Sequence, residues 1–407
     1  MEVIKGGVTA AAGFSAGSCE ANIKYEGRTD MAMVYSKEPC ECAGTFTSNQ
    51  VKAACVQWDM QLVKSGDPMY AVVINSGIAN ACTGKEGFDA CIATAKAVEE
   101  GLKVPYTGVA VASTGVIGMQ LPVDKLTAGV KKLIPLLSDD KEAGTAASKA
   151  IMTTDTVNKE IAVSFDIGGV KVTLGGMSKG SGMIHPNMCT MLAFLTSDIA
   201  IDKALMQKAL SEVVKDTFNM ISVDGDTSTN DTLLLMANSL AGNKKIVSEG
   251  TDYDTFKEAL FYVCRELARK MAGDGEGASK LFTARVINAK TKDDARLLAR
   301  SVISSNLSKA AVYGCDANFG RFLCAMGYSG ASFEQEDVEL YFESGAGRMK
   351  VFEYGVPLDF DEDEALKILK EDEVTVFIDM HEGTDEATAW GCDLTYDYVK
   401  INADYRS

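Results

Sequence analysis

Histidine is scarce in this chain. Only His185 and His381 occur among 407 residues. A Ser–His–Asp triad would have to use one of them, and a metal site rich in histidine is nearly excluded. A metal site made of carboxylates stays open only around Asp224-Gly225-Asp226, and we expect no metal. Nucleophilic chemistry here should therefore use a base other than imidazole.

Long apolar runs and an excess of positive charge are also absent. No run approaches the roughly 18 apolar residues of a membrane span, and residues 1–7 lack the apolar region of a signal peptide. A net charge of −17 argues against nucleic acid or an anionic membrane as partner. The eleven cysteines are scattered, as is typical of free thiols in a reducing compartment. We expect a cytoplasmic globular protein.

Short apolar runs alternate with amphipathic segments along the chain, which predicts an α/β protein of two domains or one large sandwich. The expected strands are 71–75, 109–112, 338–342 and 374–380, with a hairpin of 161–165 and 170–174. The expected helices are 88–102, 122–137, 205–214, 254–271, 293–304 and 362–369. Polar turns are expected at 76–80 and 113–115.

One threonine stands at an abrupt boundary. The glycine-rich polar run 179–189 stops at Thr190, and the apolar run 191–195 follows at once. If the bond before Thr190 is cut, its new α-amine can serve as base for its own hydroxyl, with an intrinsic pKa of about 7.7–8.0. From this pattern alone, an ordinary residue that enters a buried strand or helix is the simpler interpretation.

Several glycine-bearing loops could carry chemistry. Thr114-Gly115 offers a hydroxyl donor beside a backbone donor, as in an oxyanion hole. Asp274-Gly275-Glu276-Gly277 could hold a cation or amine through Glu276. Residues 222–231 are dense in hydroxyls and carboxylates. Ordinary turns and solvated loops are the alternative interpretation of all three.

Taken together, motifs spread over nearly the whole chain match the pattern of one known family. The matching motifs are 6–9, 44–49, 80–84, 113–118, 151–156, 179–192, 218–231, 274–278 and 402–407. On these motifs the sequence resembles the ornithine acetyltransferase family, the glutamate N-acetyltransferases of arginine biosynthesis.

The resemblance implies a fold and a processing event. The fold would be a layered α-β-β-α sandwich, shared with self-cleaving aminopeptidases. The precursor would cut itself between Cys189 and Thr190. Its products, 1–189 and 190–407, would stay associated, as a heterotetramer of two chains of each kind.

The resemblance also implies a reaction. Thr190 would take the acetyl group from N2-acetylornithine and pass it to glutamate in a ping-pong cycle. Thr114 and Gly115 would stabilise the oxyanion. No cofactor is required, although the use of acetyl-CoA as a second acetyl donor stays open. The residues implied in substrate binding are Thr153, Lys179, Thr190, Glu276, Asn402 and Ser407.

The chain departs from the family pattern near the scissile bond. Cys189 replaces a usual alanine, and His185 replaces a small apolar residue. Farther away, Ile78 replaces an asparagine and Phe319 a tryptophan. Two other functions stay open: an N-terminal-threonine aminopeptidase or amidohydrolase, in which water resolves the acyl-enzyme, and a non-enzymatic binding protein.

Overall fold

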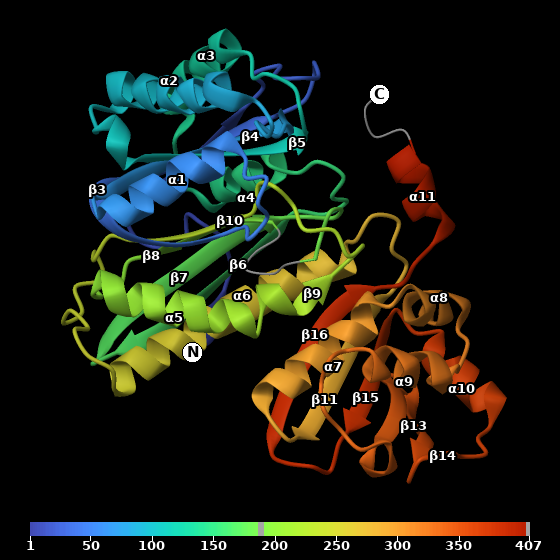
Figure 1. The fold of residues 1–407 in the computed structure, drawn as a ribbon. Coiled ribbons are helices and arrows are strands. Elements are labelled where there is room, and N and C mark those ends of the chain that lie inside the picture. The colour runs from blue at the N-terminus through green and yellow to red at the C-terminus, as the bar shows by residue number, and fades with distance from the viewer. Residues whose placement is uncertain (186–190, 404–407) are drawn as a thin grey trace. The chain divides into compact units, whose positions relative to one another are not determined.

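The computed structural model describes residues 1–185 and 191–403. The chain divides into two compact units. Figure 1 colours the chain by residue number, from blue at the N-terminus to red at the C-terminus. The described residues of the first unit are 1–180, 191–215 and 227–267. Those of the second are 181–185, 216–226 and 268–403. Each unit is built around one mixed sheet, which confirms the predicted α/β class.

The sheet of the first unit has nine strands within the described residues, in the order β1-β6-β7-β8-β10-β3-β4-β5, with β2 paired to β3. Their bounds are β1 Glu2–Ile4, β2 Phe14–Cys19, β3 Met31–Phe46, β4 Met69–Ile78, β5 Val109–Val116, β6 Lys159–Ile167, β7 Val170–Lys179, β8 Leu192–Ser197 and β10 Thr232–Ala237. Every residue of β8 and β10 is buried. Such continuous apolar strands are typical of the middle of a sheet that is covered on both faces.

Helices pack against this sheet. Their bounds are α1 Ala54–Ser65, α2 Gly84–Leu102, α3 Val123–Leu133, α4 Lys141–Ala150 and α5 Lys203–Lys215. Helix α1 contacts β3 and β5, α4 contacts β2 and β3, and α5 contacts β3. The expected helix 122–137 ends at Leu133 and continues as the 3₁₀ turn Ile134–Leu136, because Pro135 has no backbone N–H for the helical ladder.

The hairpin is confirmed, and its strands are longer than predicted. Strands β6 and β7 pair in register from Lys159↔Ser178 to Ile167↔Val170. Gly168 and Gly169 alone form the turn, both with positive φ, which glycine adopts without steric strain. The long pairing brings Lys179, the last residue of β7, opposite Leu192, the first residue of β8.

The predicted turns at 76–80 and 113–115 are wrong in part. Residues 76–78 belong to β4 and 113–115 to β5, where Gly77 pairs with Gly115. A Cβ on Gly115 would lie 2.2 Å from the carbonyl carbon of Gly77. The small residues therefore permit a close approach of two strands, a role that sequence alone does not distinguish from a turn.

The second unit has a sheet in the order β14-β13-β12-β15-β11-β16-β9. Its strands are β9 Ile221–Ser222, β11 Leu281–Ala289, β12 Glu339–Ser344, β13 Gly347–Glu353, β14 Val356–Pro357, β15 Glu373–Asp379 and β16 Asp385–Cys392. Its helices are α7 Lys292–Ser304, α8 Asn306–Gly314, α9 Phe319–Gly327, α10 Glu362–Leu369 and α11 Tyr396–Ala403. Strands β12 and β15 and helix α10 confirm the predicted elements.

Helix α6, Thr251–Gly273, begins in the first unit and ends in the second. Helix α7 is capped by the hydroxyl of Thr291, which accepts from the Asp294 N–H at 3.1 Å, so it starts just before the predicted Asp293. Of the helices in the described part of the chain, none has the length and apolarity to cross a bilayer.

Candidate active site

The parallel pair β4–β5 positions the predicted oxyanion donors. Thr114 and Gly115 directly precede Val116, the last residue of β5. Gly115 has φ +132°, a backbone conformation that residues other than glycine rarely adopt. This φ and the close approach of Gly77 together require glycine at position 115. The backbone at Gly115 therefore runs differently from that of a regular strand.

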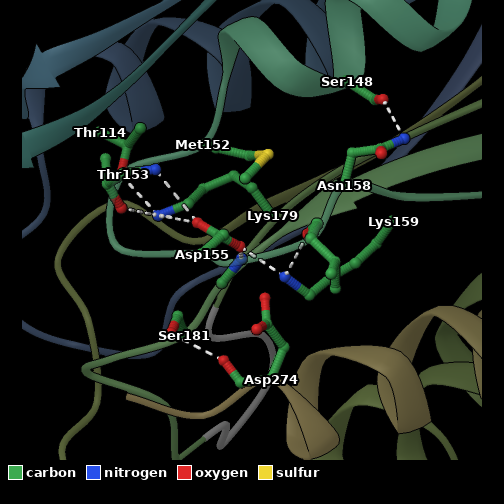
Figure 2. Close-up of polar contacts among 12 residues, drawn as sticks. Thr114, Ser148, Met152, Thr153, Asp155, Asn158, Lys159, Lys179, Ser181 and Asp274 are labelled. Atoms are coloured by element: carbon green, nitrogen blue, oxygen red, sulfur yellow. Dashed lines mark hydrogen bonds and ion pairs between the residues drawn. The ribbon is translucent and has the colours of Figure 1, made fainter. Parts of the chain in front are cut away.

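Lys179 joins the hydroxyls of two predicted site residues. Its side chain is 8% exposed, and its ammonium donates to Thr114 Oγ1 at 3.2 Å and to Thr153 Oγ1 at 2.8 Å. Figure 2 shows the three side chains pointing toward one another. They come from three segments far apart in sequence: the end of β5, the connection between α4 and β6, and the end of β7.

The buried carboxylate of Asp155 lies next to this cluster and binds the groups around it. Its side chain is fully buried. One oxygen accepts from Lys159 Nζ and from the Gly180 N–H, both at 2.7 Å. The other accepts from the Thr153 N–H at 3.1 Å and lies 3.9 Å from Lys179 Nζ.

The charge state of Asp155 follows from these neighbours. Burial alone raises the pKa of its carboxyl. The charges of Lys179 and Lys159, with the hydrogen bonds from Lys159 and Gly180, outweigh burial and lower the pKa to about 2. Asp155 is therefore ionised at neutral pH. Asp155 is not among the site residues predicted from the sequence, although an Asp and a Lys four residues apart before an apolar strand are a detectable signal.

A cavity of about 560 Å³ opens beside Thr153, a size typical of small-molecule sites. Its lining residues are Arg28, Thr29, Lys149, Met152, Thr153, Asp155, Thr156, Val157 and Asn158. Two of them, Arg28 and Lys149, are cationic in a chain of net charge −17. Arg28 also donates to the Met152 carbonyl, which ties the cavity wall to the connection that carries Thr153.

In the second unit, Glu276 and Asn402 lie together. Asn402 Nδ2 donates to Glu276 Oε2 at 2.7 Å. Glu276 is 5% exposed, so the alternative of a solvated acidic loop at 274–277 is wrong. The loop is fixed because the Glu276 N–H donates to the Ser181 carbonyl at 3.0 Å and Ser181 Oγ donates to the Asp274 carbonyl at 2.7 Å.

Asp224 binds the backbone of residues 183 and 184 within the second unit. Its carboxylate accepts from the Met183 N–H at 2.6 Å and the Ile184 N–H at 2.9 Å. The Val223 N–H donates to the Ile184 carbonyl at 2.7 Å. Asp224 is thus occupied with backbone donors, and the described residues include no group of three or more His, Cys, Asp or Glu side chains arranged to hold a metal ion.

Three predicted site residues, Cys189, Thr190 and Ser407, lie outside the described residues. What is described beside them is strand β8, which begins two residues after Thr190. The Met191 carbonyl accepts from the Thr232 N–H at 2.9 Å. The predicted apolar run 191–195 therefore enters a buried strand.

The fold is that of an α/β protein, in which the Thr114 and Thr153 hydroxyls lie against the buried Lys179 ammonium. Comparison with known proteins identifies the kind. The ArgJ family model matches residues 15–407, and the chain belongs to the ArgJ family.

Close relatives extend over the whole length. The arginine biosynthesis bifunctional protein ArgJ 1 of Clostridium acetobutylicum is 50% identical, over 97% of this chain and 96% of its own. The corresponding protein of Caldanaerobacter subterraneus is 49% identical over all of both chains. Among solved structures, the ArgJ protein of Bacillus halodurans is 43% identical and covers 52% of this chain and 97% of its own, with a TM-score of 0.49.

Proposed function

We propose that this chain transfers the acetyl group of N2-acetyl-L-ornithine to L-glutamate through an acetyl ester on Thr190. It is a bifunctional acetyltransferase of arginine biosynthesis, and its second activity makes N-acetylglutamate from acetyl-CoA. The observation that carries the mechanism is the contact of the Lys179 ammonium with the Thr114 and Thr153 hydroxyls, in a chain that matches the ArgJ family from residue 15 onward.

The proposed enzyme first cuts itself. The Thr190 hydroxyl oxygen attacks the Cys189 carbonyl carbon, the C–N bond breaks, and the Thr190 nitrogen takes the hydroxyl proton. Water then hydrolyses the resulting ester, which leaves a carboxylate on Cys189 and restores the Thr190 hydroxyl. The products are residues 1–189 and 190–407.

The freed α-amine is the base for acetyl transfer. It takes the Thr190 hydroxyl proton as the oxygen attacks the acetyl carbonyl carbon, and it returns that proton to the departing nitrogen of ornithine. The Thr114 hydroxyl and the Gly115 N–H stabilise the oxyanion, and one such donor is typically worth about 3–4 kcal/mol. Glutamate reverses these steps with its own amine. Because one amide replaces another, no cofactor is needed to drive the exchange.

Charge supports the assignment of the binding residues. The Lys179 ammonium and the Thr153 hydroxyl suit the α-carboxylate of an amino acid. The buried Glu276 carboxylate, held by Asn402, suits the side-chain ammonium of ornithine. Ser407 joins the set by family resemblance.

The second acetyl donor is polyanionic. Acetyl-CoA carries phosphate groups, and the cavity beside Thr153 presents Arg28 and Lys149. We assign the phosphate-bearing arm of acetyl-CoA to these two side chains. The assembly we propose is two copies of each cleaved chain, which a mass measurement on the native protein would test.

Purified protein should show two bands on a denaturing gel, and Thr190→Ala should show one, because the variant lacks the nucleophile. The wild type should release ornithine from N2-acetylornithine only when glutamate is added, and it should release free CoA from acetyl-CoA when glutamate is present. Gel electrophoresis, amino-acid analysis and a thiol assay measure the three outcomes.

Each part of the proposal has an outcome that contradicts it. A single full-length band from active wild-type protein would rule out self-cleavage. Equal ornithine release without glutamate would identify a hydrolase. If acetyl transfer from N2-acetylornithine to glutamate occurs but no CoA is released from acetyl-CoA, only the second activity is ruled out.

A further inference from the structure

The direction of the hydrogen bonds at Lys179 decides where the Thr114 hydroxyl hydrogen points. An ammonium can only donate, so Thr114 Oγ1 accepts from Lys179 at 3.2 Å and Thr153 Oγ1 accepts at 2.8 Å. Each hydroxyl has one hydrogen, which must then lie away from Lys179. A hydroxyl that accepts from a cation is also a stronger donor, because chained hydrogen bonds polarise one another.

An oxyanion donor needs this arrangement. A free hydroxyl rotates and can present either its hydrogen or a lone pair, whereas a donor that is oriented beforehand needs no reorganisation when the oxyanion forms. Lys179 therefore has a second role beyond carboxylate binding: it selects the donating orientation of Thr114.

Lys179 in turn depends on Asp155. The two oxygens of this fully buried carboxylate contact three segments of the first unit, through the Thr153 N–H, the Lys159 ammonium and the Gly180 N–H. The Lys179 ammonium lies 3.9 Å away, within direct electrostatic range. Figure 2 shows Asp155 between the two lysines. A buried ammonium without a nearby anion would shift toward its neutral form.

We propose that Asp155 is a positioning residue for the oxyanion donor: it keeps the Lys179 ammonium charged and seated against Thr114, so that the Thr114 hydroxyl hydrogen points to the acyl oxygen. This rests on the proposed acyl transfer. Asp155 touches no reacting atom, and its effect passes through Lys179 and Thr114.

A double-mutant cycle tests the route. Asp155→Asn keeps the shape and removes the charge, and Thr114→Val removes the hydroxyl. We expect Asp155→Asn to lower kcat by about 100-fold, as misplacement of a catalytic group does, and Thr114→Val by about 100- to 1,000-fold. The double variant should be close to Thr114→Val alone, because the effect of Asp155 is lost once the hydroxyl is gone. Values of kcat are calculated per cleaved molecule, from the two gel bands.

Lys159 provides the matched control. Its side chain is 1% exposed, and its ammonium is bound to Asp155, so Asp155→Asn alone leaves a buried charge without its partner and can destabilise the fold. Asp155→Asn/Lys159→Met removes both charges and should lose kcat like Asp155→Asn. Lys159→Met alone keeps Asp155 beside Lys179 and should therefore lose less kcat than Asp155→Asn.

A purely structural role for Asp155 predicts a different result. The losses from Asp155→Asn and Thr114→Val would then multiply, to at least about 10,000-fold, or Lys159→Met would lower kcat as much as Asp155→Asn. Either result overturns the inference, as does an unchanged kcat in Asp155→Asn.

Hydrolysis of 4-nitrophenyl acetate, run on the same variants, separates this inference from the proposed function. It needs the oxyanion donor but neither ornithine nor glutamate. If the wild type hydrolyses this ester without transferring acetyl groups between amino acids, the proposed function fails and the cycle still tests Asp155. If the wild type does transfer acetyl groups and the losses multiply, only the inference fails.

Discussion

At the scale of single residues, His185 shows how neighbours fix a protonation state. Its Nε2 lies 3.1 Å from Arg300 Nη2, and its Nδ1 lies 3.0 Å from Ser222 Oγ. Because a guanidinium only donates, Nε2 is the acceptor and Nδ1 carries the proton. Burial first, and then the charge of Arg300, lower the pKa of His185 from 6.5 to about 4. His185 is therefore neutral at physiological pH.

This pKa shift predicts a pH dependence of stability. Between pH 6.5 and 4 the unfolded chain binds a proton at His185 that the folded chain does not, so stability falls as pH falls through this window. His185→Gln keeps a neutral polar side chain and removes the titration. Between pH 7 and pH 5, we expect the Tm of the variant to fall by about 2–4 °C less than the Tm of the wild type. Calorimetry measures both Tm values.

If His185→Gln and the wild type lose the same Tm over this range, the protonation state assigned to His185 is wrong.

At the scale of elements, the connection between α4 and β6 does most to shape the site. Residues 151–158 carry Thr153 and Asp155, and they form a wall of the cavity that Lys149 enters from the last turn of α4. Its conformation is set by Asp155 within the connection and by the bond from Arg28 to the Met152 carbonyl. One connection therefore links the hydroxyl cluster to the cationic cavity.

Reversal of the charge at this element should separate the two acetyl donors. Lys149→Glu places a carboxylate where we assign a phosphate-bearing arm, and a change of about 1–2 kcal/mol is reasonable for such a contact near the surface. We expect the KM for acetyl-CoA to rise about tenfold or more, with the KM for N2-acetylornithine unchanged. Steady-state kinetics with each donor measure both.

Lys141→Glu is the matched control for Lys149→Glu. Lys141 is an exposed lysine in the first turn of the same helix, about 12 Å along the axis from Lys149. Equal effects of the two variants, or a rise in both KM values in Lys149→Glu, would argue against a phosphate site at Lys149.

At the scale of the whole molecule, the proposed cleavage between residues 189 and 190 does not fall at the boundary of the compact units. Strands β8 and β10 come from residues 190–407, and they lie in the first sheet between β7 and β3, which come from residues 1–189. Residues 181–185, which would belong to the first product, lie in the second unit. Each unit would therefore contain residues of both proposed cleavage products.

This interlacing predicts that the cleaved chains stay together under native conditions. Strand pairing and apolar burial hold them, and salt screens neither strongly, in contrast to surface ion pairs. The two fragments should elute as one species in about 1 M NaCl, where the Debye length is only about 3 Å. They should separate only in denaturant. Size-exclusion chromatography followed by a denaturing gel measures this, and separate native peaks in salt would contradict it.

Local patterns were sufficient for much of the fold. Short apolar runs marked β4 and β5, the Gly168-Gly169 turn marked the β6–β7 hairpin, and helical spacing marked α5 and α6. These signals survive because each depends on residues close together in sequence. The same patterns were wrong where small residues serve the packing of strands: Gly77 and Gly115 look like turn residues, and they pair across β4 and β5.

The α/β class, the ArgJ family and the candidate nucleophile can be predicted from the sequence, because they depend on local periodicity and on motifs kept in order along the chain. The groups that surround Thr114 become known only from the three-dimensional fold. Lys179 is far from Thr114 in sequence and contacts it from the end of β7. Asp155, in the α4–β6 connection, lies 3.9 Å from Lys179. Hydrogen-bond direction and buried charge depend on such three-dimensional neighbours, and no spacing along the chain encodes them.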